Sequence, residues 1–193
     1  PAINAFATGR EPLLASIAIS KGAIEKLKNE ELEGVIAHEL SHVKNFDIRF
    51  MTLVAVLVGA ISIMAQIFLR SQFLFGSRRR DNEGGGQLAA IFMVIGIVLA
   101  ILSPIIAELI KLAISRRREY LADASGVLAT RFPEGLANAL EKIKMENLPL
   151  KQASSATAHL FLANPLRSNS VMNLFSTHPP LEERIKRLRE MGV

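Results

Sequence analysis

Residues 35–43, VIAHELSHV, place His38 and His42 one helical turn apart with Glu39 between them. Because side chains at positions i and i+4 lie on the same side of a helix, both imidazoles can reach one ion. Zinc prefers nitrogen ligands in a tetrahedron with one open position, and a neighbouring carboxylate can take a proton from a water there. The alternative is two histidines at the edge of a core helix, each bonded to a carbonyl group or to water. The spacing favours a zinc site with Glu39 as the general base.

The segment around this motif is predicted to be a helix preceded by a small sheet. Asn29 is the expected N-cap, and the acidic residues Glu30 and Glu31 follow it in the first turn. Earlier in the chain, Asn4–Thr8 and Leu13–Ser20 flank the turn signal GREP, which predicts a short β-hairpin. The apolar stripe of the helix consists of Leu32, Val35, Ile36, Leu40 and Val43.

The composition points to a membrane-embedded part. Half of the 193 residues are apolar, and the mean hydropathy is +0.29. Phe50–Leu69 and Leu88–Ala107 are runs without a charged residue, and each is long enough to cross a bilayer. An alternative is a buried helix pair in a soluble protein, but the runs are apolar on all faces instead of striped. We therefore expect a transmembrane helical hairpin at residues 50–107, with a polar loop at 70–87.

A third metal ligand is predicted beyond this hairpin. The chain has no cysteine, so His, Asp or Glu must hold any metal. In RRREYLADASG, residues 116–126, Glu119 and Asp123 lie one turn apart; Glu119 could complete the site, and Asp123 could accept the other ring N–H of a ligand histidine. Acids beside arginines also form solvated ion pairs. Two membrane crossings, however, return the chain to its starting side, which favours Glu119 as a ligand.

The basic residues indicate orientation and the kind of partner. The net charge is +5, and its arginine clusters flank apolar segments instead of alternating with aromatic residues. This pattern is typical of membrane flanks, and we expect no nucleic-acid partner. Six basic residues border the hairpin on the side of the histidine motif, against four in the loop. This bias predicts that the site faces the cytoplasm. The six are Lys44, Arg49, Lys111 and Arg116–Arg118, and the four are Arg70 and Arg78–Arg80.

Taken together, the motifs resemble the HtpX family of membrane zinc metalloproteases, which are related to the type I CAAX prenyl proteases. The resemblance covers Asn4 to about Leu188 and keeps the family's order of motifs. The segments that carry it are Asn4–Gly9, His38-Glu39-x-x-His42, Glu119-Tyr120-x-x-Asp123 and Thr177-His178-Pro179-Pro180-Leu181-x-x-Arg184-Ile185. Family members usually have two further N-terminal transmembrane segments, so we expect the chain to be a piece of a longer one.

The resemblance implies specific roles for these residues. It implies that His38, His42 and Glu119 bind one zinc ion, that Glu39 is the base and that Asp123 supports His38. His178 would lie near the zinc and stabilise the oxyanion or occupy the open position; its alternative role is a helix cap. Arg184 would orient an acid or the substrate, or form a structural ion pair. The strand residues Asn4, Ala5, Phe6 and Ala7 are the candidate edge for pairing with an extended substrate.

The expected fold class is α+β and predominantly helical: a zincin-like (gluzincin) catalytic domain, residues 1–49 and 108–193, interrupted by the transmembrane hairpin. The expected activity is zinc-dependent hydrolysis of peptide bonds in misfolded or damaged membrane proteins, without ATP, at the cell inner (plasma) membrane. Its expected partners are those substrates, the lipid bilayer, and membrane protease regulators or further copies of the chain. The alternatives are a prenyl-protein (CAAX-type) endopeptidase and a catalytically silent zinc-bound membrane scaffold.

Overall fold

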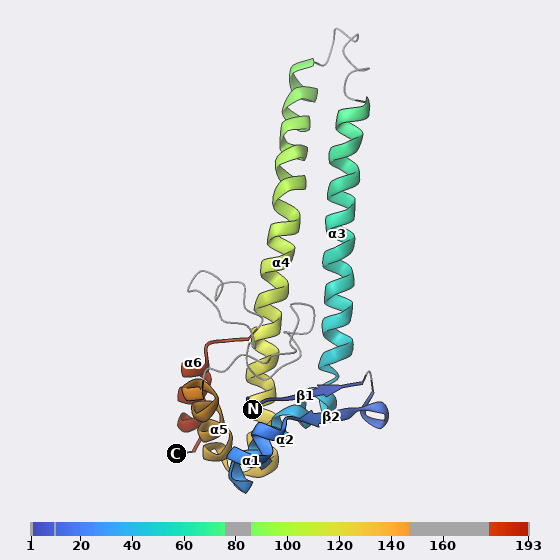
Figure 1. The fold of residues 1–193 in the computed structure, drawn as a ribbon. Helices are drawn as coiled ribbons and strands as arrows, with labels where there is room; N and C mark the ends of the chain where they lie inside the picture. The colour runs from blue at the N-terminus through green and yellow to red at the C-terminus, as the bar shows by residue number, and fades with distance from the viewer. Residues whose placement is uncertain (1, 10, 76–85, 147–177, 193) are drawn as a thin grey trace. The chain divides into compact units, whose positions relative to one another are not determined.

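The computed structural model describes residues 2–9, 11–75, 86–146 and 178–192 (Figure 1). Most of these residues are helical, so the predicted predominance of helix is confirmed, while the zincin-like arrangement stays a prediction. The elements in chain order are β1 (Ala5–Thr8), the 3-10 turn η1 (Pro12–Leu14), β2 (Ser16–Ile19), α1 (Lys21–Lys26), α2 (Asn29–Lys44), α3 (Asp47–Phe75), α4 (Gly86–Thr130), α5 (Pro133–Glu146) and α6 (Leu181–Glu190).

The chain divides into two compact units. The first, which we call the site unit, consists of Pro1–Met51 and Leu112–Val193. The second, the apolar unit, consists of Thr52–Lys111. The domain bounds expected from the sequence, 1–49, 50–107 and 108–193, stay a prediction, and residues 76–85 of the expected loop lie outside the described part.

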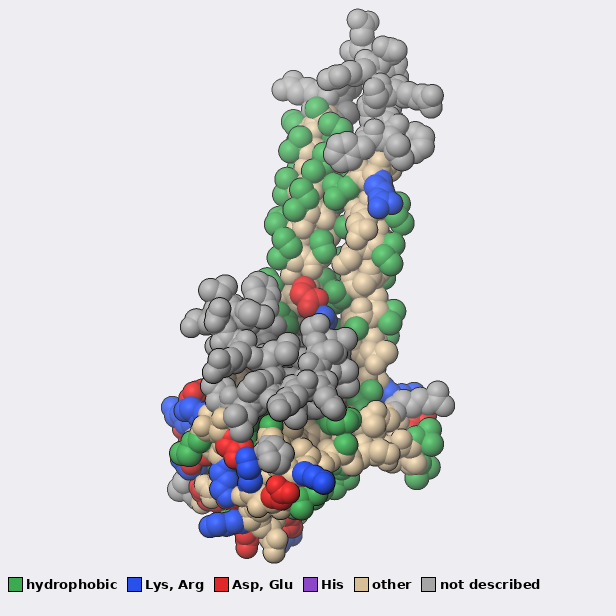
Figure 2. All heavy atoms as spheres, in the orientation of Figure 1, with side chains coloured by type: hydrophobic (Ala, Val, Ile, Leu, Met, Phe, Trp, Pro, Cys, Tyr) green, Lys and Arg blue, Asp and Glu red, His purple; other side chains and the backbone are tan. Residues whose placement is uncertain are grey.

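The apolar unit contains most of α3 and the first part of α4. Both helices are long and apolar enough to cross a membrane, and only 11% of the most apolar window of each is buried. Their side chains therefore do not form the core of a folded domain, and Figure 2 shows apolar side chains along the visible face of both. The two helices meet where Gly96 of α4 faces Phe68 of α3, because an added Cβ would lie 2.7 Å from the phenyl Cζ.

Helix α4 is one continuous helix of 45 residues and includes Pro104. The apolar run within it ends at Glu108 and Lys111, whose side chains form an ion pair at 2.8 Å. The helix then continues into the site unit, where it carries Glu119 and Asp123. The second apolar run and the candidate third ligand therefore belong to a single helix.

The site unit combines the predicted β-hairpin with a helical core. Strands β1 and β2 are antiparallel, with Ala5 opposite Ile19 and Thr8 opposite Ser16. Helix α5 packs against both α2 and α6. A Cβ on Gly34 of α2 would lie 2.6 Å from the backbone nitrogen of Leu136 in α5, so the glycine permits this close approach. The buried cluster includes Ile3, Ala23, Val35, Leu136, Leu140, Ile185 and Leu188.

Two details of the predicted motif helix were wrong. The N-cap is Lys28 and not Asn29, and its backbone N–H donates a hydrogen bond of 2.7 Å to the carboxylate of Glu31. The carboxylate of Glu31, in the first turn, thus accepts a hydrogen bond from the backbone at the start of the helix, as in a capping box. Leu40, placed in the apolar stripe, is 51% exposed, because α5 covers the side of α2 that carries Gly34 and Val35.

Candidate metal centre

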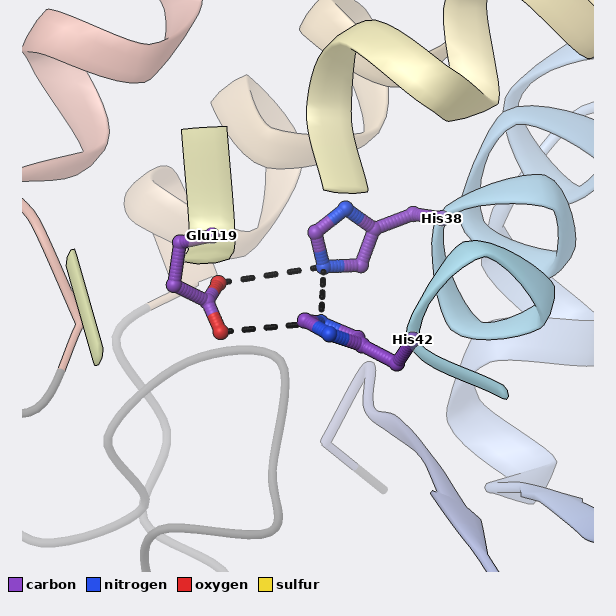
Figure 3. A group of neighbouring side chains, drawn as sticks. All are labelled: His38, His42 and Glu119. Carbon is purple, nitrogen blue, oxygen red and sulfur yellow. Dashed lines mark hydrogen bonds and ion pairs between the residues drawn. The ribbon is translucent and has the colours of Figure 1, made fainter. Parts of the chain in front are cut away.

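The side chains of His38, His42 and Glu119 converge on one point (Figure 3). The Nε2 atoms of the two histidines are 3.1 Å apart. Glu119 Oε2 lies 3.8 Å from Nε2 of His38, and Oε1 lies 3.6 Å from Nε2 of His42. Ligand atoms of a tetrahedral zinc site, with bonds of about 2.0–2.1 Å, are roughly 3.3 Å apart. Two imidazole nitrogens and a carboxylate at these spacings suit one zinc ion.

A close approach of two helices brings these ligands together. His38 and His42 lie on α2, and Glu119 lies on α4. One turn and two turns beyond Glu119, Asp123 and Gly126 lie on the same face of α4. A Cβ on Gly126 would be only 3.1 Å from the backbone nitrogen of His38, so the missing side chain allows α4 to pass directly over the motif helix.

His38 is supported on its other ring nitrogen by a buried ion pair. Its Nδ1 lies 2.9 Å from Asp123 Oδ1. Arg184 of α6 has no exposed surface and donates two hydrogen bonds to Asp123, from Nε at 2.9 Å and from a terminal nitrogen at 2.7 Å. A carboxylate on Nδ1 fixes the tautomer that leaves Nε2 available for a metal. Asp123 thus lies where the sequence analysis placed it, and Arg184 orients that acid.

Neighbouring positive groups in the site unit favour the ionised forms of the buried carboxylates Glu119 and Asp123. Asp123 and Glu119 lie on the part of α4 that follows Lys111 and belongs to the site unit. Burial alone would raise the pKa of Asp123, but Arg184 and His38 together lower it to about 2. Burial likewise opposes ionisation of Glu119, yet His178, Arg184 and His38 hold its pKa well below the usual value. Both carboxylates are therefore ionised at neutral pH, the form in which Glu119 can bind a metal.

His42 has a corresponding partner that the sequence analysis missed. Its Nδ1 lies 2.7 Å from Asp47 Oδ2, and Asp47 is buried at 4% exposure. Arg118 forms an ion pair with Asp47 and donates a hydrogen bond of 2.6 Å to the carbonyl of Asn45. The chain turns between α2 and α3 at Asn45 and Phe46, and the φ of Phe46 is 54°, which is unusual for a non-glycine residue; Asp47 follows this turn directly.

Comparison with known proteins places the chain in a family. The model of peptidase family M48 matches residues 1–192. The chain belongs to peptidase family M48. It is 50% identical over 192 residues to a protease HtpX homologue of Dictyoglomus turgidum, covering 100% of this chain and 61% of that protein. A protease HtpX homologue of Caldanaerobacter subterraneus subsp. tengcongensis is 50% identical over 195 residues, covering 100% of this chain and 64% of that protein.

A third protease HtpX homologue, of Tropheryma whipplei, is 49% identical over 192 residues, covering 100% of this chain and 64% of that protein. The chain therefore spans about three fifths of the length of the curated relatives it matches. No solved structure matches it. The resemblance to HtpX-type proteases that the motifs indicated is confirmed by the family and by these relatives.

The remaining predicted residues of this M48 chain lie around the centre. His178, which precedes α6, has Nδ1 3.1 Å from Glu119 Oε2. It therefore contacts a candidate ligand, as expected of a residue near the zinc. Glu39 is buried and follows His38 on α2. Neither the roles of these residues nor the ligand set is tested by this geometry.

Strand β1 contains Ala5, Phe6 and Ala7, and Asn4 precedes it directly. The strand pairs with β2 and contacts α2, the helix that carries the histidine motif. The backbone N–H of Asn4 donates to Ser20 Oγ at 2.9 Å, and this hydroxyl also caps α1, so the start of the strand is fixed. Its use as an edge for substrate stays a prediction.

Proposed function

We propose that this chain is the catalytic part of a membrane-bound zinc endopeptidase. The observation that carries the proposal is the cluster of His38, His42 and Glu119, whose ligand atoms all lie within 4.8 Å of one another. The Nδ1 atoms of both histidines face carboxylates, which leaves both Nε2 atoms for a metal. Membership of a peptidase family supports the same chemistry.

The reaction divides among residues of the site unit. When bound by His38, His42 and Glu119, zinc would make a water acidic and polarise the peptide carbonyl. Glu39 takes a proton from the attacking water and passes it to the leaving amine. His178 donates a hydrogen bond to the carbonyl oxygen as negative charge develops there. Main-chain pairing with Asn4–Ala7 holds the substrate extended without selecting particular side chains.

The substrates we propose are misfolded or damaged membrane proteins. Two helices apolar enough to cross a bilayer support a location in the inner (plasma) membrane. The excess of basic residues on the side of the histidine motif supports a cytoplasmic site. Membrane protease regulators or further copies of the chain are the proposed additional partners.

Replacing the base tests the chemistry. Glu39→Gln keeps the shape of the side chain but cannot accept a proton, so cleavage of casein or a membrane substrate should fall about 10²–10⁴-fold. Zinc content should stay near one ion per chain. The matched control is Glu33→Gln, an exposed position on the same helix, which should leave both quantities unchanged. Undiminished cleavage by Glu39→Gln would refute this mechanism, and a zinc-loaded wild type without cleavage would favour the silent scaffold.

Replacing the third ligand tests the metal set. Glu119→Ala should lose the zinc, because two histidines alone rarely retain it. Metal analysis of the purified protein after dialysis measures the effect. Full zinc occupancy in Glu119→Ala would remove Glu119 from the ligand set, whatever the activity of the variant.

Single cysteines test the orientation, because the chain has none of its own. Ser77 lies between the two apolar runs in the sequence, and Ser16 is an exposed residue of β2 in the site unit; each is replaced by cysteine in turn. A membrane-impermeant thiol reagent applied to intact cells should label only Ser77→Cys. Labelling of Ser16→Cys alone would invert the topology, and labelling of both would argue against a membrane hairpin.

A further inference from the structure

The turn between β1 and β2 displays two leucines that nothing in the described part of the chain covers. In the segment Glu11–Leu14, which we call the hairpin tip, Leu13 is 96% exposed and Leu14 is 59% exposed. Contiguous exposed apolar groups rimmed by polar residues are one mark of a surface that contacts a membrane. We propose that the hairpin tip inserts its leucines into the bilayer surface beside the start of α3; this rests on the membrane location proposed above.

The tip is an ordered turn and not a loose loop. Leu14 N–H donates to the carbonyl of Glu11 at 2.9 Å, which closes the 3-10 turn η1. Gly9 has a φ of 113°, and a Cβ there would lie 2.5 Å from the carbonyl oxygen of Leu14. Only glycine fits this backbone position, and its close packing against Leu14 holds the turn in one shape. Insertion of the leucines would therefore need little additional ordering of the chain.

An ion pair ties the tip to the end of α3 where its apolar run begins. Glu11 Oε1 lies 3.8 Å from a terminal nitrogen of Arg49, and both residues belong to the site unit. Arg49 is the last charged residue before the uncharged run from Phe50 to Leu69. A basic residue at that position of a membrane-spanning helix lies at the level of the lipid headgroups. Glu11 therefore lies at that level too, with its charge paired.

The distance that Leu13 can lie from Glu11 is similar to the depth at which apolar side chains insert into a bilayer surface. Leu13 is two residues from Glu11, so its Cα can lie no more than roughly 7 Å away. Apolar side chains of peripheral membrane proteins insert about 5–10 Å into the boundary between headgroups and acyl chains. The aromatic residues Phe46 and Phe50 flank Arg49 on the same stretch of chain and are also partly exposed. The tip and this junction thus offer the bilayer apolar groups beside a cation.

Another exposed leucine provides a matched control. Leu128 of α4 is 79% exposed and belongs to the site unit, as Leu13 does. It follows Lys111, where the apolar unit ends, by 17 helical residues, or about 26 Å along the helix axis. Both leucines are thus largely exposed, whereas only Leu13 belongs to a turn that is held, through Glu11, to Arg49 at the start of the apolar run.

The experiment uses single cysteines carrying an environment-sensitive fluorophore. The fluorophore is attached to one of three single-cysteine variants of the full chain: Leu13→Cys, Leu57→Cys in the apolar part of α3, or Leu128→Cys. Each labelled protein is reconstituted into phosphatidylcholine–phosphatidylglycerol vesicles. A fraction of the lipids carries a nitroxide quencher high on the acyl chain. We expect quenching of the labels at positions 13 and 57, and none at position 128.

Each other outcome overturns the inference in a distinguishable way. If position 57 is quenched and position 13 is not, the tip stays in water while the membrane location stands. If position 57 is not quenched, both the tip insertion and the membrane location fail. Quenching at both 13 and 128 would mean that the whole site unit lies on the lipid without a specific tip. A label at position 13 that responds to added unfolded casein but not to quencher lipids would assign the leucines to substrate binding.

Discussion

His38 and His42 face the same metal position from surroundings of different kinds. The His38 flank, consisting of Asp123 and Arg184, joins α2 to α4 and α6, and its arginine is fully buried. The His42 flank, consisting of Asp47 at the start of α3 and Arg118 of α4, supports the histidine near the end of α2, and the Arg118 side chain is 22% exposed. Each flank gives a histidine one carboxylate and one arginine, but only the first lies wholly in the core.

Because the two arginines differ in burial, we expect the two flanks to contribute differently to folding stability and to metal affinity. A buried ion pair that loses one partner leaves a charge in the core without compensation, which is costly. In a pair with one partly exposed partner, water screens the charges in part, so the loss of that partner costs less. The His38 flank should therefore couple the metal centre to the folding of the site unit, whereas the His42 flank should act mainly on the orientation of one imidazole. Five substitutions test this contrast.

The largest effect is expected from Arg184→Met. It leaves Asp123 buried without its cation and should lower the free energy of unfolding of the metal-free chain by about 3–5 kcal/mol. Arg118→Met should lower it by less, because Arg118 is partly exposed and water can reach the carboxylate of Asp47 in its place. Chemical denaturation followed by circular dichroism measures both, with Lys186→Met at an exposed position of α6 as the control. Equal losses in the two arginine variants would contradict the contrast.

An intermediate effect is expected from Asp47→Asn. The amide cannot replace the carboxylate on His42 Nδ1, so zinc affinity should fall about 10-fold, with little change in the stability of the metal-free chain. Asp123→Asn should cost up to about 100-fold in affinity and destabilise the chain as well. Competition with a chelator gives the affinities, and Glu33→Gln is the control. An unchanged affinity in Asp47→Asn would remove Asp47 from the support of His42.

The smallest effect is expected from Gly126→Ala. Its Cβ would meet the backbone of His38 at 3.1 Å, so α2 must shift by a few tenths of an ångström. The better helix propensity of alanine offsets part of this crowding, and the net loss of stability should stay below about 1 kcal/mol. Zinc affinity should fall slightly. Gly59→Ala, whose Cβ would meet nothing within 4 Å, should leave the affinity unchanged; a fall of equal size there would show that the contact with His38 is not the cause.

The sequence predicts the candidate site where helical spacing determines which side chains lie on the same face of a helix. The i and i+4 spacing of His38 and His42, and of Glu119 and Asp123, predicts which side chains share a helix face. The even number of apolar runs predicts that these faces can meet. Asp47 could not be found in this way, because its contact with His42 depends on the turn at Phe46, where φ is positive. The available signal was an acid five residues beyond the second histidine.

Other differences depend on packing that the sequence does not encode locally. The exposure of Leu40 follows from which side of α2 is covered by α5, and a helical stripe cannot predict its partner. The continuation of α4 past its apolar run depends on helix-forming residues on both sides of the charged boundary. The sequence offers Arg184 as a residue that orients an acid or the substrate or forms a structural ion pair, but it does not identify Asp123 as the partner, because 61 residues separate the two.

The position of Arg184 in the chain also sets an order of events during biosynthesis. A ribosome produces His38 and Asp123 well before α6, and domains generally fold as units while synthesis proceeds. Until α6 has emerged and docked, Asp123 lacks the guanidinium that compensates its buried charge, and the pocket around His38 cannot close without that penalty. Completion of the candidate metal centre therefore requires that α6 has been synthesised and has docked beside Asp123.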